Sequence, residues 1–446
     1  MSKTTIEFIN HASVLISSSK INLLSDPWYS GPAFHYGWRL LHEIQEEKII
    51  NILKKTTHIY ISHEHPDHFS TQFFLNKSIK KILIEKNIEI LFQYTSDKRV
   101  VNFLRKNNFK TKELKPNEKI SLSEDVQIQI IKHDFYDSSL IFKTPNLKIL
   151  NLNDCPMRED NEIKKFQKKY GFFDILLTQF SYAAWKGGID NKNYRENAAE
   201  EKLCSIEKQA SILNCKSIIP FASFIYFSNE LNFYMNDSIN TPEKIKKRFS
   251  DKKFNVVFLS PDEIQELENL KQKQLSLDFW KVKYDNINLL SRDKFEKSIN
   301  LQDLILEYKN YKRKIQKKNS KFLIYFLKKI KLINLFQSIN IKLHDHKKIY
   351  QYSIFEGLVE STNIKPDVSM HSQSLAFIFK NEFGFDTLTV NGCFECSQEG
   401  FSKLAKTFAI GSLNALGIRL NLGLLIKPQI VFLFFFKLKK VLSKLV

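Results

Sequence analysis

The stretch Ser62-His63-Glu64-His65-Pro66-Asp67-His68 follows a short apolar run at residues 58–61. It sets three imidazoles and the carboxylate of Asp67 close together on the chain. Such groups are costly to bury, and they have no structural use when they are clustered on a surface. Imidazole nitrogen and carboxylate oxygen are ligands for zinc, iron and manganese. The stretch therefore predicts a metal site at the end of a strand.

Length and composition restrict the kind of protein. A chain of 446 residues exceeds the usual size of one domain. The five cysteines are odd in number and widely scattered, which argues against a disulfide framework and favours a reducing compartment. The N-terminus lacks the pattern of a secretory signal, and no apolar run is long enough to span a membrane. We therefore expect a cytoplasmic protein.

Strand-like and helix-like segments alternate along the first part of the chain. Strands are predicted at 5–9, 12–16, 21–25, 58–62, 81–84, 88–92, 125–131, 138–143, 147–152, 174–178, 216–220 and 254–259, and helices at 44–54, 70–79, 97–107, 161–169 and 196–214. Alternation of this kind is typical of a layered α/β domain. Beyond about 270 the chain becomes lysine-rich and helix-like through 275–350, and 374–379 with 385–390 resemble a hairpin. We predict a catalytic domain at 1–270 and a basic helical and α+β extension at 271–446.

Two loops are dense in aromatic residues and glycine. The first runs from Trp28 to Arg39, and the second covers residues 179–188. We interpret the first as a binding loop, with packing on the body of the domain as the alternative.

A metal site built on the motif needs further ligands from other strand ends. Only His133 is available between the motif and residue 343, and it follows a predicted strand. With His63 and His65 it would form a three-imidazole site with one position open for water, as in catalytic zinc sites. Asp67 and His68, with Asp154 as a bridge, could hold a second ion. His11 is interpreted as structural.

This order of residues resembles the metallo-β-lactamase superfamily, whose αββα sandwich brings such strand ends into one cleft. More narrowly, Asp26-Pro27-Trp28, Asn153-Asp154-Cys155, the 179–188 loop and residues 220–224 are similar to the metallo-β-lactamase portion of CMP-N-acetylneuraminate hydroxylase. The resemblance implies a four-layer α/β fold with metal ligands at His63, His65, Asp67, His68, His133 and Asp154. It also implies that Asp26 orients the ligands without binding the metal.

The chain departs from that family in two respects. No cysteine is followed at the second or third position by histidine, so the pairs of a Rieske iron–sulfur domain are missing and oxygenase chemistry by this chain alone is not expected. No histidine between 134 and 343 can complete the second metal site, so the second ion is expected to be weak or absent.

The favoured interpretation is a metal-dependent hydrolase with one or two zinc ions, or with iron or manganese. Water on the metal would attack a phosphodiester, a sugar nucleotide or a related small acidic substrate, and Asp67 would orient that water or move its proton. The predicted substrate contacts are Tyr29, His35, Trp38 and Arg39. The alternatives are a hydroxylase-like subunit that needs a separate Rieske partner, and a non-catalytic binding protein.

Basic residues gather in the second half of the chain. Between Lys309 and Lys348 there are thirteen Lys or Arg and one acid, Asp345. With the apolar and basic tail at 432–440, this stretch is interpreted as a solvated helical face or as a peripheral membrane contact. Nucleic-acid binding is not expected, because no aromatic platform is interleaved with the charge.

Overall fold

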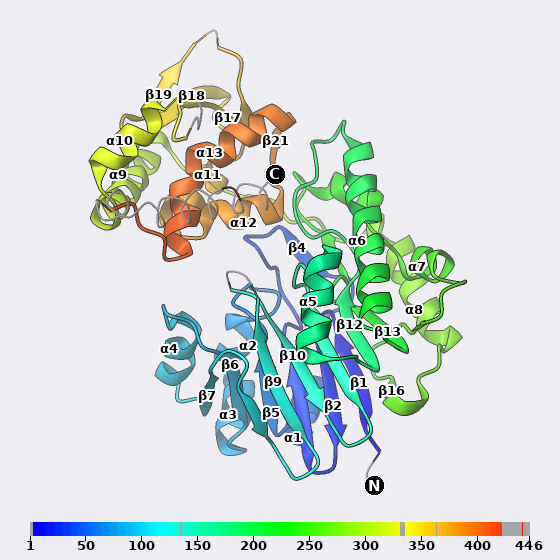
Figure 1. Cartoon of the computed structure of the whole chain (residues 1–446). Coiled ribbons are helices and arrows are strands. Elements are labelled where there is room, and N and C mark those ends of the chain that lie inside the picture. Colours follow the sequence, from blue (N-terminus) through cyan, green and yellow to red (C-terminus); the bar gives the residue numbers. More distant parts are fainter. Residues whose placement is uncertain (1–2, 134–135, 331–334, 363, 422–438, 440–446) are drawn as a thin grey trace.

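The computed structural model describes all residues except 1–2, 134–135, 331–334, 363, 422–438 and 440–446. The predicted membrane contact at 432–440 lies outside the described residues, apart from Lys439. Two seven-stranded sheets dominate the first part of the chain (Figure 1). In spatial order, the first sheet contains β16 (Ile264–Glu266), β1 (Thr5–Asn10), β2 (Ser13–Ser18), β3 (Ile21–Ser25), β5 (His58–Ile61), β6 (Glu89–Gln93) and β7 (Thr111–Leu114). The second contains β15 (Asn255–Val256), β13 (Ser217–Phe221), β12 (Ile175–Gln179), β11 (Lys148–Asn153), β10 (Ser138–Lys143), β9 (Gln127–Lys132) and β8 (Lys119–Ser121).

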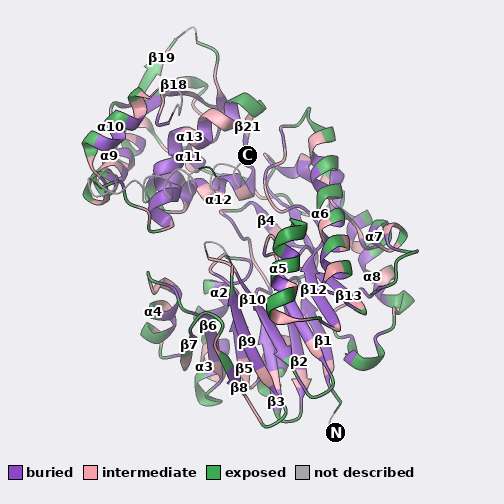
Figure 2. Cartoon of the chain, viewed as in Figure 1, coloured by how far each residue is buried: buried purple, intermediate pink, exposed green. Residues whose placement is uncertain are grey.

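The two sheets share one apolar core. Ile16 and Leu91 of the first sheet belong to the same buried cluster as Ile128 and Leu177 of the second. The strands of both sheets are mostly buried (Figure 2). Apolar residues that alternate along each strand supply this shared core with every second side chain.

Helices cover the outer face of each sheet. On the first sheet, Leu24 packs in one cluster with residues of α1 (Glu46–Lys55), α2 (Thr71–Leu75), α3 (Lys77–Glu85) and α4 (Arg99–Lys106). On the second, Leu150 packs in one cluster with Ile163 and Phe166 of α5 (Asp160–Tyr170). The order helix, sheet, sheet, helix confirms the predicted αββα sandwich.

Three further helices complete this part of the chain. They are α6 (Lys192–Ile212), α7 (Pro242–Arg248) and α8 (Gln274–Asp285). Trp280 of α8 is fully buried in the core between the sheets, and its ring stacks on Phe224 with centroids 3.8 Å apart. Helix α8 thus packs on the sandwich although it follows position 270, and the division into 1–270 and 271–446 stays a prediction.

The last part of the chain forms a smaller α+β unit, which we call the C-terminal unit. Its sheet contains β19 (Gly357–Ser361), β18 (Lys348–Ser353), β17 (Ile339–Leu343), β20 (Val368–Met370) and β21 (Phe394–Cys396). Its helices are α9 (Leu301–Lys318), α10 (Lys321–Lys329), α11 (Ser372–Lys380), α12 (Gly384–Asn391) and α13 (Gln398–Ala415). Tyr352 of the sheet stacks on Phe408 of α13 with ring centroids 4.9 Å apart.

The two aromatic loops join the C-terminal unit to the sandwich. Phe34 and Trp185 belong to the buried cluster of the C-terminal unit, and the Trp185 ring lies 4.5 Å from that of Phe401. The Trp185 amide donates to the Thr389 carbonyl at 2.8 Å. A short two-stranded sheet of β4 (Trp38–Leu40) and β14 (Ile225–Phe227) supports the first loop.

Three secondary-structure predictions are wrong. The predicted hairpin at 374–379 and 385–390 consists of helices α11 and α12, and the predicted strand at 81–84 lies inside α3. Most residues of α11 are buried, so apolar side chains occur on all of its faces. A short apolar run of this kind looks the same in a buried helix and in a buried strand. The predicted helical stretch 275–350 also contains β17 and the start of β18.

Candidate metal centre

The metal motif begins where β5 ends. Strand β5 runs parallel to β3, so Asp26, which follows β3, lies beside the start of the motif. One carboxylate oxygen of Asp26 accepts the Ser62 amide proton at 2.7 Å, and the other accepts the Ser62 hydroxyl at 2.8 Å. The second oxygen also contacts His68 Nδ1 at 2.9 Å. Both carboxylate oxygens of Asp26 are therefore engaged by Ser62 and His68. Asp26 fixes the position of the loop and the orientation of the His68 ring.

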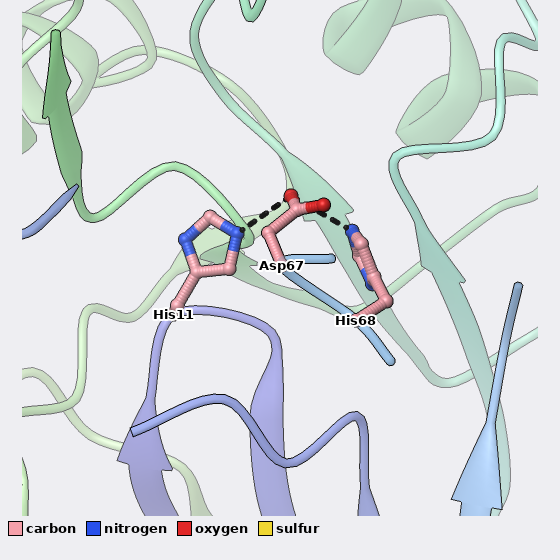
Figure 3. Close-up of side chains that lie close together, drawn as sticks. All are labelled: His11, Asp67 and His68. Atoms are coloured by element: carbon pink, nitrogen blue, oxygen red, sulfur yellow. Dashed lines mark hydrogen bonds and ion pairs between the residues drawn. The ribbon is translucent and has the colours of Figure 1, made fainter. Parts of the chain in front are cut away.

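One group of ligands contains His11, Asp67 and His68, which are all buried (Figure 3). Asp67 Oδ2 lies 3.3 Å from His11 Nε2 and 3.3 Å from His68 Nε2. We call this group the Asp67 cluster. It brings the turn after β1 against the far end of the motif.

A second group contains His63, His68 and Asp154. Asp154 Oδ2 lies 3.7 Å from His63 Nε2 and 3.7 Å from His68 Nε2. His63 Nε2 also lies 2.7 Å from Nδ1 of His65, so the two imidazoles of the motif are in direct contact. We call His63, His65 and Asp154 the Asp154 cluster, and His68 is shared between the two clusters.

Burial and charge together set the protonation of these groups. Burial disfavours the charge on His68, but Asp67, Asp154 and Asp26 raise its pKa well above the usual range. Burial opposes ionisation of Asp67 as well, yet the charge of His68 and hydrogen bonds hold its pKa well below the usual range. Burial, with the neighbouring His63, lowers the pKa of His65 to about 4. His65 is therefore neutral at physiological pH, which is the form that ligates a metal.

The donor atoms fit a divalent transition metal. Within the described part of the chain, four buried atoms of these clusters have no hydrogen-bond partner: His11 Nδ1, Asp67 Oδ1, His68 Nε2 and Asp154 Oδ1. Buried polar atoms without partners are rare and point to a missing ligand. In each of the groups His11–Asp67–His68 and His63–His68–Asp154, the ligand atoms lie within 4.8 Å of one another. Because His68 Nδ1 is bound to Asp26, His68 can offer only Nε2, and therefore only to one ion.

His133 does not join either cluster. Ile128 and Ile130 of β9 face the core between the sheets, whereas Ile131 faces the outer helix layer. With the period of two, His133 continues the outer face. Its Nε2 lies 2.8 Å from the Ser139 hydroxyl, and its ring stacks over Phe166 of α5 with centroids 5.9 Å apart. The prediction that His133 completes a three-imidazole site is not supported by this position.

His11 is the residue that sequence reasoning missed. It was interpreted as structural, yet its Nε2 contacts Asp67, and its ring packs edge-on against Trp28 with centroids 5.4 Å apart. A signal was present: β1 and β3 are both antiparallel to β2, so they point the same way. His11 therefore follows a strand that ends at the same edge as those before Asp26 and the motif.

Two of the predicted substrate contacts are internal. Tyr29 is buried under α2, with its hydroxyl 2.7 Å from that of Ser13. Trp38 is buried as well and packs against Phe34 with ring centroids 4.5 Å apart. Neither side chain is placed to meet a ligand, because the aromatic loop packs into the molecule.

The other two predicted contacts join parts of the chain. His35 stacks on Phe377 of α11 with centroids 4.2 Å apart and lies 5.1 Å from Phe295. The Arg39 guanidinium makes a two-point ion pair with Asp293, from Nε at 2.7 Å and from Nη2 at 2.8 Å. The planar guanidinium of Arg39, which would suit an acidic substrate, is thus already bound to a carboxylate of the chain.

Comparison with known proteins adds the following similarities. No protein-family model matches the chain. The chain is 23% identical over 276 residues to the cytidine monophosphate-N-acetylneuraminic acid hydroxylase of Danio rerio, covering 58% of this chain and 44% of that protein. It is 25% identical over 295 residues to the hydroxylase of Asterias rubens, covering 61% and 43%. The chain thus spans less than half the length of these curated relatives.

Solved structures with a similar backbone include two metalloproteins. The diiron β-hydroxylase CmlA of Streptomyces venezuelae has a TM-score of 0.41 at 13% identity, with 60% of this chain and 54% of that chain covered. The metallo-hydrolase Igni18 of Ignicoccus hospitalis also has a TM-score of 0.41 at 13% identity, with 59% and 97% covered.

Proposed function

We propose that this protein is a metal-dependent hydrolase acting on a phosphodiester, a sugar nucleotide or a related small acidic substrate. The observation that carries the proposal is the meeting of buried imidazoles and carboxylates at one edge of the sandwich, with ligand atoms left unpaired. Zinc, iron or manganese bound there would supply Lewis acidity, lowering the pKa of a coordinated water and stabilising developing negative charge.

Asp67 and Asp26 have separate roles in the proposed reaction. His11 and His68 hold Oδ2 of Asp67 from two sides, so Oδ1 is the carboxylate atom left to accept a proton from the attacking water. Asp26 fixes the ring of His68 through Nδ1, which keeps Nε2 directed at the cluster. Burial of the site excludes bulk water and strengthens each of these interactions.

The proposal is tested by removing metal from the protein, adding back one metal at a time, and measuring hydrolysis of bis-p-nitrophenyl phosphate. We expect turnover after addition of zinc, manganese or iron, and loss of turnover in Asp67→Asn. Asp125→Asn, at an exposed loop far from the motif in sequence, is the matched control and should keep the activity. Full metal binding without turnover of any ester or phosphodiester would favour the non-catalytic binding protein instead.

A second candidate is a hydroxylase-like subunit that works with a separate Rieske partner. It rests on the similarity to the hydroxylases alone, and each alignment covers less than half of those proteins. Oxygen consumption that depends on an added iron–sulfur protein would support this candidate, and metal-dependent hydrolysis without any such protein would argue against it.

Membrane contact is a separate proposal for the C-terminal unit. Helix α10 exposes Phe322, Tyr325 and Phe326, whose exposed fractions are 63%, 51% and 47%. Lys321 and Lys328 flank these rings on the same helix. Exposed aromatics beside lysines are typical of an interfacial helix on anionic lipid. No helix in the described ranges is long and apolar enough to cross a membrane.

Sedimentation with anionic vesicles at low salt tests that contact. We expect the protein to co-sediment with vesicles that contain phosphatidylserine, and Phe322→Ser with Phe326→Ser to weaken binding. The paired control is Phe172→Ser, another exposed phenylalanine on the sandwich. Equal binding of all variants, or no binding of the wild type, would contradict the proposal.

A further inference from the structure

A cavity of about 320 Å³ lies between the metal motif and the C-terminal unit. Glu64, His65 and Pro66 of the motif form one wall. Helices α12 and α13, with Val390 and Ala415 among their lining residues, form the opposite wall. In Figure 1 α12 lies between the rest of the C-terminal unit and the strand ends of the sandwich. Because His65 touches His63 of the Asp154 cluster, the cavity opens beside the metal centre.

The wall formed by α12 is held against the sandwich by hydrogen bonds from asparagine side chains to backbone carbonyls. Asn232 donates to the Asn391 carbonyl at 2.6 Å, and the Asn391 side chain donates to the Phe34 carbonyl at 3.2 Å. The backbone at Gly37 approaches Asn391 so closely that an added Cβ would meet the Asn391 Cβ at 2.3 Å. The cavity is therefore preformed, which lowers the cost of ordering a ligand in it.

The lining of the cavity is mainly apolar, with acidic side chains and the hydroxyl-bearing residues Tyr136, Thr387, Thr389 and Ser412. Phe34, Phe383, Val390, Ala415 and Leu416 supply apolar surface, and no lysine or arginine occurs among the described lining residues.

Besides His65 and Tyr136, the ionisable side chains of the lining are the carboxylic acids Glu64, Asp137 and Asp386. Asp386 accepts a hydrogen bond from the Ser412 hydroxyl at 2.6 Å, and burial raises its pKa to about 6. An anionic group would meet acidic neighbours here with no cation to balance it.

Arginine 99 lies near this cavity, but its charge is already balanced. Arg99 donates to Glu64 at 3.0 Å and pairs with Asp97 at 2.7 Å. The guanidinium lies over the Phe383 ring, 3.9 Å from its centre. It thus ties α4 to the C-terminal unit, and two carboxylates balance its charge, although its buried Nε has no hydrogen-bond partner among the described residues.

We propose that this cavity binds an uncharged apolar chain, alkyl or acyl, that belongs to the substrate and adjoins the group held at the metal centre. The inference rests on the proposed hydrolase function and deepens it. Of the substrate classes named above, it selects a phosphodiester with an apolar chain over a sugar nucleotide. The C-terminal unit then has a defined role, because its helices form the wall that contacts the chain.

Binding of an uncharged fluorescent probe, N-dodecyl dansylamide, to the full-length protein tests the cavity directly. We expect saturable binding, and we expect Val390→Trp to weaken it by at least about tenfold by filling the cavity. Val359→Trp is the matched control, since Val359 is 55% exposed on β19, and it should bind as the wild type does. Thr387→Trp, on the same wall, serves as a second variant if Val390→Trp has a lowered melting temperature.

Displacement of the probe identifies the chemical class of the ligand. In the series hexanol, octanol and decanol we expect the competing affinity to rise about fourfold for each added methylene, as burial of hydrocarbon requires. Cytidine monophosphate should not displace the probe. The inference would be overturned if the competing affinity did not rise along the alcohol series, or if cytidine monophosphate displaced the probe at a lower concentration than decanol does. Unchanged probe binding in both cavity-filling variants would overturn it as well.

The same measurements separate failure of this inference from failure of the proposed function. His68→Ala, which removes the shared ligand of the metal clusters, should still bind the probe. Probe binding without any hydrolase activity in the wild type would refute the function and leave the apolar site intact. Hydrolysis of bis-p-nitrophenyl phosphate without probe binding would refute the apolar site alone.

Discussion

Asp67 and His68 meet an imidazole from the beginning of the chain, whereas His63 and His65 do not meet the imidazole that the sequence offered them. The Asp67 cluster gains His11, which lies 3.3 Å from the Asp67 carboxylate. The Asp154 cluster lacks His133, whose ring stacks over Phe166 in the outer layer of the sandwich. The half of the motif that looked incomplete therefore gains a histidine, and the other half lacks the histidine that was predicted for it.

The difference between the clusters depends on two properties of a strand, which are its direction and the face on which each side chain lies. Which edge of the sheet a residue reaches depends on the direction of its strand, and His11 reaches the same edge as the motif because β1 runs with β3. Which face it occupies depends on the period of two, and one residue decides between the cleft and the outer layer. His133 follows the end of a strand, as a ligand would, but its side chain lies on the outer face of the sheet.

The largest effect should come from His68→Ala, since this imidazole is common to both clusters. We expect more than about a hundredfold loss of metal affinity, because removal of an outer hydrogen-bond partner alone costs about 10–100-fold. Elemental analysis of the gel-filtered protein measures it. His58→Ala, on the preceding strand, is the control and should keep its metal. Full metal content in His68→Ala would refute both clusters.

A more selective loss is expected for His11→Ala. If the Asp67 cluster binds an ion, this variant should lose it and its affinity should fall by at least about tenfold, while the Asp154 cluster is unaffected. Titration of cobalt into the metal-free protein, followed by its visible spectrum, reports each imidazole environment. If the cobalt affinity and spectrum of His11→Ala equal those of the wild type and only the melting temperature falls, His11 is structural and the Asp67 cluster does not use it as a ligand.

A smaller effect is expected for Asp26→Asn, because Asp26 acts only through His68. The amide keeps the shape of the side chain but loses the charge that faces His68 Nδ1 at 2.9 Å. We expect a loss of about 10–100-fold in metal affinity with little change in stoichiometry. Isothermal titration calorimetry separates affinity from stoichiometry. Complete loss of a binding site would instead mean that Asp26 is itself a ligand.

The smallest effect on metal binding is expected for His133→Ala. This variant loses the hydrogen bond with Ser139 and the contact with Phe166, which costs roughly 1 kcal/mol of unfolding free energy. Its metal content should equal that of the wild type, as measured by elemental analysis beside a urea denaturation curve. If metal is lost at unchanged stability, β9 must present His133 to the cleft, and the contrast between the clusters would disappear.

Much of the fold could be predicted from local patterns. The αββα order followed from strands and helices that alternate along the first part of the chain, and the metal motif lies at a strand end as its spacing indicated. Helices α11 and α12 could not be recognised, because a buried helix and a strand both appear as short apolar runs. The first aromatic loop was interpreted as a binding loop, and only its packing against the C-terminal unit shows that His35 and Arg39 are engaged within the chain.

The sequence by itself determined the kind of donor atoms that the candidate site contains. Neutral imidazoles and carboxylates at the spacing of residues 63–68 suit a transition metal wherever the loop lies, because the preference is a property of the donor atoms. Only the tertiary structure decided which distant side chains join them. His11 and Asp154 lie far from the motif along the chain and close to it in space. His11 follows a strand that runs in the same direction as β3 and β5, and Asp154 follows β11 of the sheet that packs against them. The cavity between the motif and α12 likewise exists only because two units meet there.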